Sequence, residues 1–183
     1  MSRELVEKAM HGDQVAFGLL AERSLRRLVG TAGLILGDAA QAEDAAQEAM
    51  VRAWRDLPSL RDPERFEGWL YRLLIHACHD QRRQARHELR IDELIPGQGR
   101  WQPDASAQLA DRDEIDRGLE RLTADQRAVV VLRYYLGLSD AEIAQATRIP
   151  LGTVKSRLNR ALSALRAALA AEARVGPAEE RVT

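Results

Sequence analysis

The sequence predicts an all-α protein made of two small helical domains joined by a flexible linker. Apolar residues make up 45 % of the 183 residues, enough for a core, whereas Gly (12) and Pro (6) are too few to break many helices. Apolar side chains recur at the helical period on both sides of residues 89–107, but not within them, where PGQGRWQPDAS is rich in turn residues. The expected domains are residues 1–88 and 108–174, followed by a disordered tail at 175–183.

Four helices are predicted in the first domain, at residues 2–10, 13–37, 39–56 and 64–87. Asp13 and Asp38 stand where N-caps are expected, and Gly37 is a typical end for the second helix. The third helix places its alanines and Met50 inward and its acidic and amide residues outward. The loop LPSLRDP precedes a fourth helix that is aromatic and apolar in its first half and basic in its second half.

The second domain is expected to contain helices at residues 109–122 and 124–135, followed by a helix-turn-helix within 138–166. Thr123 with Gln126, and Ser139 with Glu142, have the spacing of capping boxes, which mark two helix starts. Pro150 cannot continue the first helix of the motif but suits the first turn of the next one.

The last predicted helix has one apolar stripe and one polar side. The stripe comprises Val154, Leu158, Ala161, Leu162, Leu165 and Leu169, and the polar side comprises Lys155, Ser156, Asn159, Arg160 and Ser163. Such a helix can enter a DNA major groove, where Ser and Asn contact base edges and Lys and Arg reach phosphates or guanine. An ordinary amphipathic surface helix is the alternative, but the lack of acidic residues from 150 to 171 favours DNA.

Charge is segregated along a chain whose net charge is only −1. Acidic residues dominate residues 38–67, whereas Arg and Lys dominate residues 72–90 and 153–174. Two basic elements and one acidic surface indicate two nucleic-acid contacts and a different partner for the acidic surface.

Other classes of protein find little support. The single cysteine, Cys78, excludes an internal disulfide framework, and neither a long apolar run nor a signal-peptide core occurs, so a cytoplasmic location without membrane insertion is expected. His76, Cys78, His79 and Asp80 crowd together, but His76 and Asp80 share a helix face that Cys78 does not. We expect no metal, no cofactor and no catalytic residues.

Three stretches together resemble the bacterial sigma-70 family: EDAAQEAMVRAWRDL, FEGWLYRLLIHACHDQRR and LTADQRAVVVLRYYLGLSDAEIAQATRIPLGTVKSRLNRALSALR. The chain is similar to its extracytoplasmic-function (ECF) group, which keeps only domains two and four. The resemblance implies a non-enzymatic factor that binds core RNA polymerase, through its beta-prime clamp helices and beta flap, and directs it to promoter DNA. It also implies an anti-sigma protein as a further partner.

The resemblance assigns roles to three groups of residues. The third helix would bind the clamp helices through Asp44, Gln47 and Glu48. The loop and fourth helix would bind and melt the minus-ten element through Ser59, Arg61, Phe66, Trp69, Arg72, His76, Arg82 and Arg83. The last helix would bind the minus-thirty-five element through Thr153, Lys155, Ser156, Arg157, Asn159 and Arg160.

The chemistry of these groups agrees with the implied roles. Unpaired bases need aromatic faces and a basic track, which the fourth helix provides, with Trp69 at the family's duplex-opening position. Plain core packing is the alternative for Phe66, and His76 replaces an Asn that is frequent in the family. In the last helix, Lys155 and Arg157 are expected to hold phosphates while the other polar residues face bases.

Two other classes stay open at this point. A LuxR-type DNA-binding regulator would carry a similar helix-turn-helix but would have no use for the acidic third helix. A purely helical interaction protein would not need a polar, acid-free recognition face.

Overall fold

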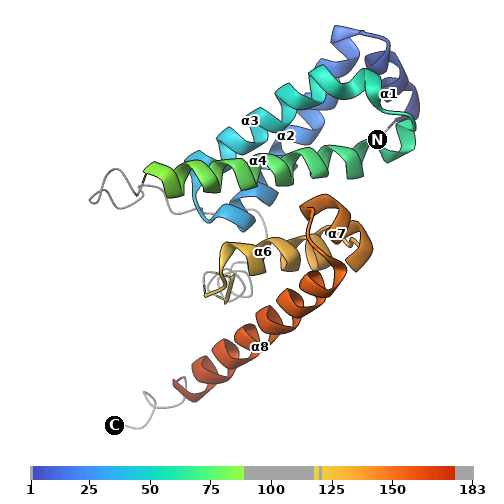
Figure 1. Cartoon of the computed structure of the whole chain (residues 1–183). Helices are drawn as coiled ribbons and strands as arrows, with labels where there is room; N and C mark the ends of the chain where they lie inside the picture. Colours follow the sequence, from blue (N-terminus) through green and yellow to red (C-terminus); the bar gives the residue numbers. More distant parts are fainter. Residues whose placement is uncertain (1, 89–117, 120, 176–183) are drawn as a thin grey trace, which may run out of the picture. The chain divides into compact units, whose positions relative to one another are not determined.

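The computed structural model describes residues 2–88, 118–119 and 121–175, and every regular element in these ranges is a helix (Figure 1). The predicted all-α fold class is confirmed. Two compact units divide the chain, Met1–Pro103 and Asp104–Thr183. Three predicted features lie outside the described residues: the linker, the tail and the helix start near Leu109 and Ile115. The finer domain boundaries therefore stay a prediction.

Within its described residues, 2–88, the first unit has four helices and two short 3₁₀ turns. The helices are α1 (Arg3–Met10), α2 (Gln14–Leu36), α3 (Ala39–Asp56) and α4 (Phe66–Glu88), and the turns are η1 (Leu57–Ser59) and η2 (Pro63–Arg65). Asp13 accepts a hydrogen bond from the Ala16 amide and Asp38 from the Gln41 amide, so both predicted N-caps are present. Gly37 ends α2 in the left-handed region, with φ 75°.

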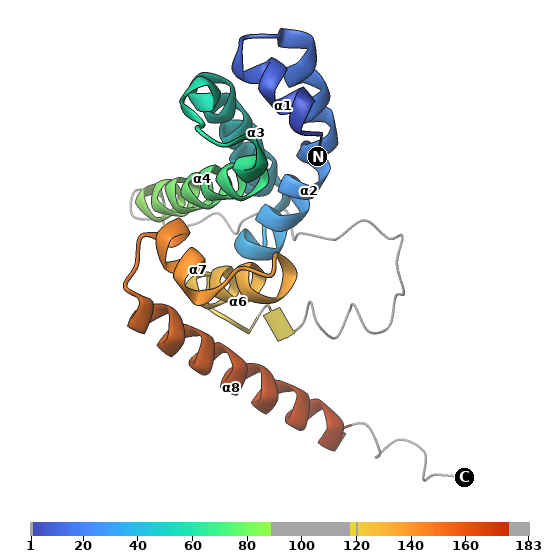
Figure 2. The same ribbon diagram turned by 90° about the vertical axis from the view of Figure 1, so that its right-hand side faces the viewer.

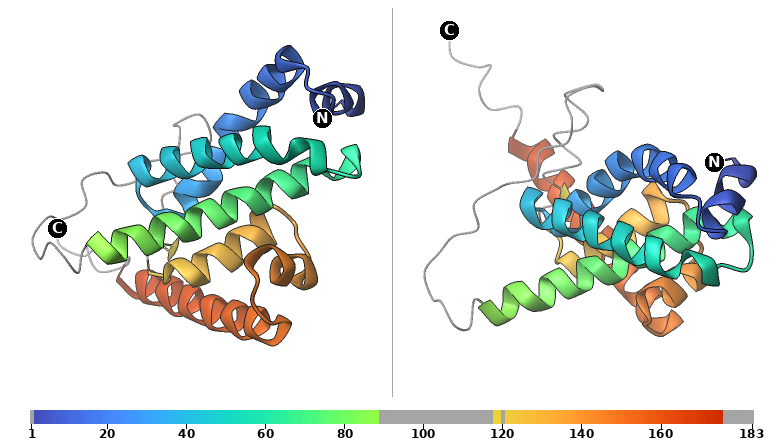
Figure 3. Two further views of the ribbon diagram at one scale, coloured as in Figure 1. Left: turned by 45° about the horizontal axis from the view of Figure 1, so that its top comes forward. Right: turned by 90° about the horizontal axis from the view of Figure 1, so that it is seen from above.

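Alanines allow α3 to pack closely between its neighbours. Ala42, Ala45, Ala46, Ala49 and Ala53 are all fully buried. Small side chains bring helix axes close together, and Figure 3 shows α3 running beside α4 along most of its length. The opposite side of α3 is therefore the outer surface of the unit. Met50, predicted inward, is only half-buried.

The fourth helix begins later than predicted, at Phe66 rather than near Glu64. Asp62 accepts a hydrogen bond from the Glu64 amide and caps a 3₁₀ turn that starts at Pro63. A tighter first turn of this kind is common at the start of helices. The loop before α4 is thus ordered by its own cap.

The second unit contains α6 (Ala124–Val130), a π-helical turn η3 (Val131–Tyr135), α7 (Asp140–Thr147) and α8 (Leu151–Val175) (Figure 2). Both predicted capping boxes are present, with side-chain and backbone bonds in each direction. The helix predicted to run straight to Tyr135 changes instead into the π turn, and Gly137 then turns the chain at φ 68°.

The core of the second unit is built from consecutive apolar residues and the inner side of α8. Its buried members include Val129, Val130, Val131, Leu132, Ile143, Val154, Leu158 and Ala161. Gly118 lies so close to α8 that an added Cβ would be 3.0 Å from Leu165 Cδ2. Leu162 and Leu165 are half-buried, and the side chain of Leu169 lies outside the described residues. The predicted apolar stripe of α8 therefore faces the core over its first three turns.

Candidate functional site

The outer side of α3 presents Asp44, Gln47 and Glu48, which are all exposed. Their spacing of three and four residues places them on one helix face, opposite the buried alanines. Carboxylate and amide groups on a rigid helix suit a basic or polar partner and disfavour DNA phosphates. The three residues predicted to act together are thus brought together.

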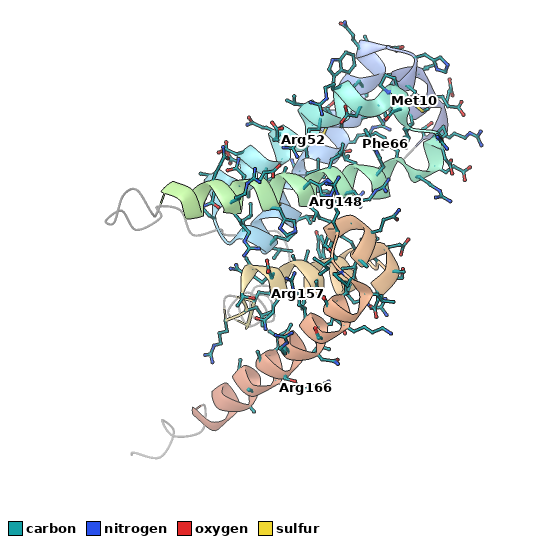
Figure 4. All side chains as sticks on the ribbon, in the orientation of Figure 1. Met10, Arg52, Phe66, Arg148, Arg157 and Arg166 are labelled. Carbon is teal, nitrogen blue, oxygen red and sulfur yellow. The ribbon has the colours of Figure 1, made fainter. Side chains whose placement is uncertain are left out.

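Arg52 joins this face to α4. Its Nε lies 2.7 Å from Glu48 Oε1, and its Nη2 lies 2.8 Å from Asp80 Oδ2. The Arg52 side chain is only 22 % exposed, and the hydrogen bond to Asp80, followed by the contacts with Glu48, raises its pKa. Figure 4 labels Arg52 where α3 lies against α4. Sequence reasoning missed this residue because Asp80 is remote in sequence.

A groove of about 530 Å³ lies between α3 and α4 around this bridge. Its lining comprises Asp44, Gln47, Glu48, Val51 and Arg52 of α3, and Ala77, Asp80, Gln81, Arg83 and Gln84 of α4. The predicted polymerase-binding residues therefore form only one wall of a hollow surface.

A different side of α4 carries Trp69, Arg72, His76 and Arg83. These residues are separated by three, four and seven positions, which places them on one helix face. The first three are half-buried and Arg83 is exposed. An aromatic ring followed by a basic track on one face is the arrangement that single-stranded nucleic acid requires. Arg82, which was predicted with them, projects from another side of the helix.

Phe66 does not belong to this face. Its side chain is 1 % exposed, and Figure 4 labels it at the start of α4. The Trp69 ring lies 6.0 Å from the Phe66 ring, tilted by 40°. A side chain buried to this degree contacts protein rather than a base, so Phe66 is excluded from the candidate site. Phe66 instead forms part of the core of the first unit, next to Trp69.

The loop before α4 presents two of the predicted residues at the surface. Ser59 and Arg61 are exposed. Leu60, which lies between them, and Leu57, which precedes them, are buried and anchor the loop. The Ser59 hydroxyl donates to the Asp56 carbonyl at 2.6 Å. The loop is therefore a fixed surface that flanks α4.

Cys78 lies within the core of the first unit, and burial raises the pKa of its thiol to about 12. The thiolate is the form that binds metals or attacks substrates. At neutral pH this thiol is protonated, so it suits packing rather than chemistry.

On α8 the predicted base-reading side chains are accessible, but two of them bind their own helix. Lys155, Asn159 and Arg160 are exposed, and Thr153 and Ser156 are half-buried. Arg160 donates from Nε to the Ser156 carbonyl and from Nη2 to Ser156 Oγ, both at 3.2 Å. These intrahelical bonds hold the guanidinium near the helix surface in the absence of DNA.

Arg157, for which a phosphate contact is predicted, forms an ion pair within the second unit. Its Nη2 lies 3.1 Å from Asp125 Oδ2 of α6, and its side chain is only 26 % exposed. The ion pair ties α8 to α6, and Figure 4 labels Arg157 on α8 close to that helix. Arg157 is thus engaged within the protein, and no sequence pattern predicts a partner for it on another helix.

A sharp turn sets the direction of α8. Arg148 adopts φ 55°, the left-handed conformation that ends α7, and Ile149 and Pro150 lead into α8. Hydrogen bonds from the Ser139 hydroxyl and amide lower the pKa of Glu142, which keeps the capping box charged. The short capped helix, the turn and the long helix form a helix-turn-helix.

These features define a helical protein with a helix-turn-helix, a motif of DNA-binding proteins, and with one surface suited to a protein partner. Two family models match the chain, Sigma-70 region 2 at residues 20–88 and Sigma-70, region 4 at residues 112–165. The RNA polymerase sigma-H factor of Pseudomonas aeruginosa is 33 % identical over 179 residues, which cover 91 % of this chain and 93 % of that protein. The chain belongs to the sigma-70 family.

Relatives named for the ECF group confirm the predicted resemblance. The ECF RNA polymerase sigma factor SigW of Bacillus subtilis is 30 % identical over 91 % of this chain and 95 % of that protein. SigL of Mycobacterium tuberculosis is 39 % identical over 74 % of this chain and 78 % of that protein. The function of the chain is that of an RNA polymerase sigma factor, which recognises promoters in transcription initiation.

Solved structures agree with this assignment. CnrH, in complex with the cytosolic domain of CnrY, has a TM-score of 0.61 and 29 % identity, over 92 % of this chain and 97 % of that chain. The sigma factor RpoE of Bartonella quintana, in complex with the anti-sigma factor NepR, has a TM-score of 0.67 and 26 % identity, over 82 % of this chain and 92 % of that chain. The LuxR-type and purely interaction-protein alternatives are set aside, because neither accounts for the match to region 2.

Proposed function

We propose that the two units divide the work of promoter recognition. The first unit binds core RNA polymerase through Asp44, Gln47 and Glu48 and receives the minus-ten strand on α4. The second unit reads the minus-thirty-five element with α8. The observation that carries this proposal is the pair of separate faces on the first unit, one acidic on α3 and one aromatic and basic on α4.

On the minus-ten side, α4 stabilises bases that leave the duplex. Trp69 offers a stacking surface at the edge of the unit, next to the buried Phe66 ring. Arg72 and Arg83 continue along the same face and attract the backbone of the single strand. Ser59 and Arg61 stand on the fixed loop beside this face, where they contact an unpaired base.

On the minus-thirty-five side, α8 enters the major groove. Asn159 and Arg160 face base edges, and Ser156 exchanges its bond with Arg160 for one with a base. Lys155, which is exposed, holds a phosphate. Thr153 lies at the start of the helix, where the N-terminus favours phosphate binding.

The partners proposed are core RNA polymerase, promoter DNA and an anti-sigma protein. The last is supported by the two similar solved structures, in which CnrH is in complex with the cytosolic domain of CnrY and RpoE with the anti-sigma factor NepR. No helix in the described residues is both long and apolar enough to cross a membrane. We place the protein in the cytoplasm and assign catalysis to the polymerase alone.

Run-off transcription from a promoter library tests the proposal. Core polymerase supplemented with the purified chain is expected to select templates that share two conserved elements, one near minus ten and one near minus thirty-five. Core polymerase alone is the control. Transcripts that are no more numerous or selective than those of core alone would contradict the proposed function.

A further inference from the structure

The groove between α3 and α4 has a wall that the proposed function leaves unused. Ala77, Gln81 and Gln84 of α4 are spaced by four and three residues, so they share one helix face, with Asp80 beside them. All of them line the groove opposite Asp44 and Glu48. The proposed contacts with polymerase include none of these α4 residues.

The groove side of α4 adjoins its promoter side, because Asp80 lines the groove and lies one helical turn from His76. Trp69, Arg72 and His76 lie on the face proposed for the minus-ten strand, and none of them lines the groove. Arg83 lies at the boundary, because it shares the face of Trp69 and also reaches the rim of the groove. One helix thus presents two surfaces of different chemistry.

The lining fits a polar protein helix better than a nucleic acid. Asp44, Glu48 and Asp80 would repel phosphates. Arg52 is occupied by Glu48 and Asp80, whereas Asp44 makes no ion pair within the part of the chain that the structure describes. Asp44 therefore offers a carboxylate to a basic residue of the partner.

The remaining lining completes this description of the partner. The side chains of Gln47, Gln81 and Gln84 can each donate and accept hydrogen bonds. Val51 on the rim is 61 % exposed, a large value for an apolar residue on an otherwise polar surface. The complementary surface is a helix with a Lys or Arg near an aliphatic residue.

We propose that a helical element of core RNA polymerase docks into the groove, so that Gln81 and Gln84 of α4 contact polymerase together with Asp44 and Glu48 of α3. This inference rests on the proposed polymerase-binding role of α3 and extends it to a second helix. Arg52 lines the site and joins its two walls through Glu48 and Asp80. Polymerase binding then acts directly on the helix that carries the promoter face.

Core affinity of the full chain, measured without DNA, tests the groove. The variant Gln81→Ala with Gln84→Ala is expected to lower affinity about tenfold, the effect of losing two neutral hydrogen bonds. Gln14→Ala, an exposed glutamine on α2 outside the groove, is the matched control and should bind as the wild type does. Thermal unfolding of both variants should match that of the wild type.

The pattern across variants separates failure of the groove from failure of the proposed function. If Asp44→Arg abolishes binding while the double glutamine variant stays within twofold of the wild type, the groove proposal is wrong and the α3 contact stands. If Asp44→Arg also binds normally, the polymerase-binding role of α3 fails and the groove fails with it. A photo-crosslinker at position 84 should label a polymerase subunit, and labelling of another copy of this chain instead would overturn the proposal.

Discussion

The two units hold their functional side chains in different ways. In the first unit, Arg52 bonds to Glu48 at 2.7 Å and to Asp80 at 2.8 Å, so two helices are tied into one prebuilt surface. In the second unit the reading side chains stand on the single helix α8, and Arg160 is bonded to its own helix at Ser156. In the proposed function the first surface is ready for a rigid partner, whereas the second exchanges its internal bonds for bonds to bases.

This difference suits the two tasks. A large protein interface gains affinity from a surface that is fixed in advance, because less side-chain entropy is lost on binding. Sequence readout gains specificity when a side chain must give up an internal hydrogen bond to bind a base. A correct base replaces that bond, whereas a wrong base does not, so the side chain stays bonded to its own helix.

The largest effect is expected from the α3 face. Asp44→Arg with Glu48→Arg should abolish binding to core polymerase, because two attractive contacts become repulsive. Co-elution of the purified variant with core polymerase is the measurement, and helicity by circular dichroism checks the fold. Glu22→Arg, an exposed charge reversal on α2, should co-elute normally. Normal co-elution of the double variant would sink the assignment of this face.

Loss of the stacking surface should come next. Trp69→Ala is expected to lower open-complex formation about tenfold, since one base–aromatic stack is worth about 1–3 kcal/mol. Closed-complex binding should change much less, because stacking matters only after bases unpair. Permanganate footprinting measures the melted region, and Trp69→Phe, which keeps a ring, should retain most of the signal. Equal footprints for the alanine variant and the wild type would refute the role of Trp69.

In the second unit, Arg160 and Lys155 should behave differently. Arg160→Ala is expected to cost about 1–3 kcal/mol on the preferred upstream element and little on mismatched duplexes. Lys155→Ala should weaken binding to all sequences alike and reduce the salt slope by about one unit. Titrations of the full chain bound to core polymerase against single-base variants, at two salt concentrations, distinguish them. The same uniform loss for both variants would show that Arg160 does not read a base.

The smallest effect concerns the internal ion pair of Arg157. Asp125→Asn removes its partner at 3.1 Å, so Arg157 becomes available to a phosphate. Non-specific DNA binding should strengthen, and the salt slope should increase by about one unit. Glu22→Gln, a change of equal charge at an exposed position of α2, is the control and should leave the slope unchanged. If both variants shift the slope equally, net charge rather than Arg157 explains the effect.

Local signals in the sequence were sufficient for most of the fold. Asp13, Asp38, Ser139 and Thr123 cap the helices that they were predicted to cap. Helix caps and apolar periods depend on residues within one or two turns, so they can be read without knowing the tertiary structure. Neither a cap residue nor a break in the apolar period marks the π turn at Val131–Tyr135, so the sequence did not predict it.

The functional surfaces were only partly predictable. The α3 face follows from spacing alone, but the wall added by Gln81 and Gln84 depends on how α4 packs against α3. The ion pairs of Arg52 with Asp80 and of Arg157 with Asp125 join residues on different helices, which a helical wheel cannot reveal. Phe66 is the opposite case: its position on α4 predicted a contact with DNA, but the structure buries its ring.

The division of work between the units is tested most directly by open-complex formation on a promoter whose minus-thirty-five element has been scrambled. The polymerase holoenzyme would be bound at concentrations high enough to occupy this template, and permanganate reactivity near minus ten would be compared with that on the intact promoter at equal occupancy. We expect weaker binding but equal reactivity per bound complex, because melting is proposed to depend on α4 of the first unit. Bound complexes that remain closed on the scrambled promoter would contradict it.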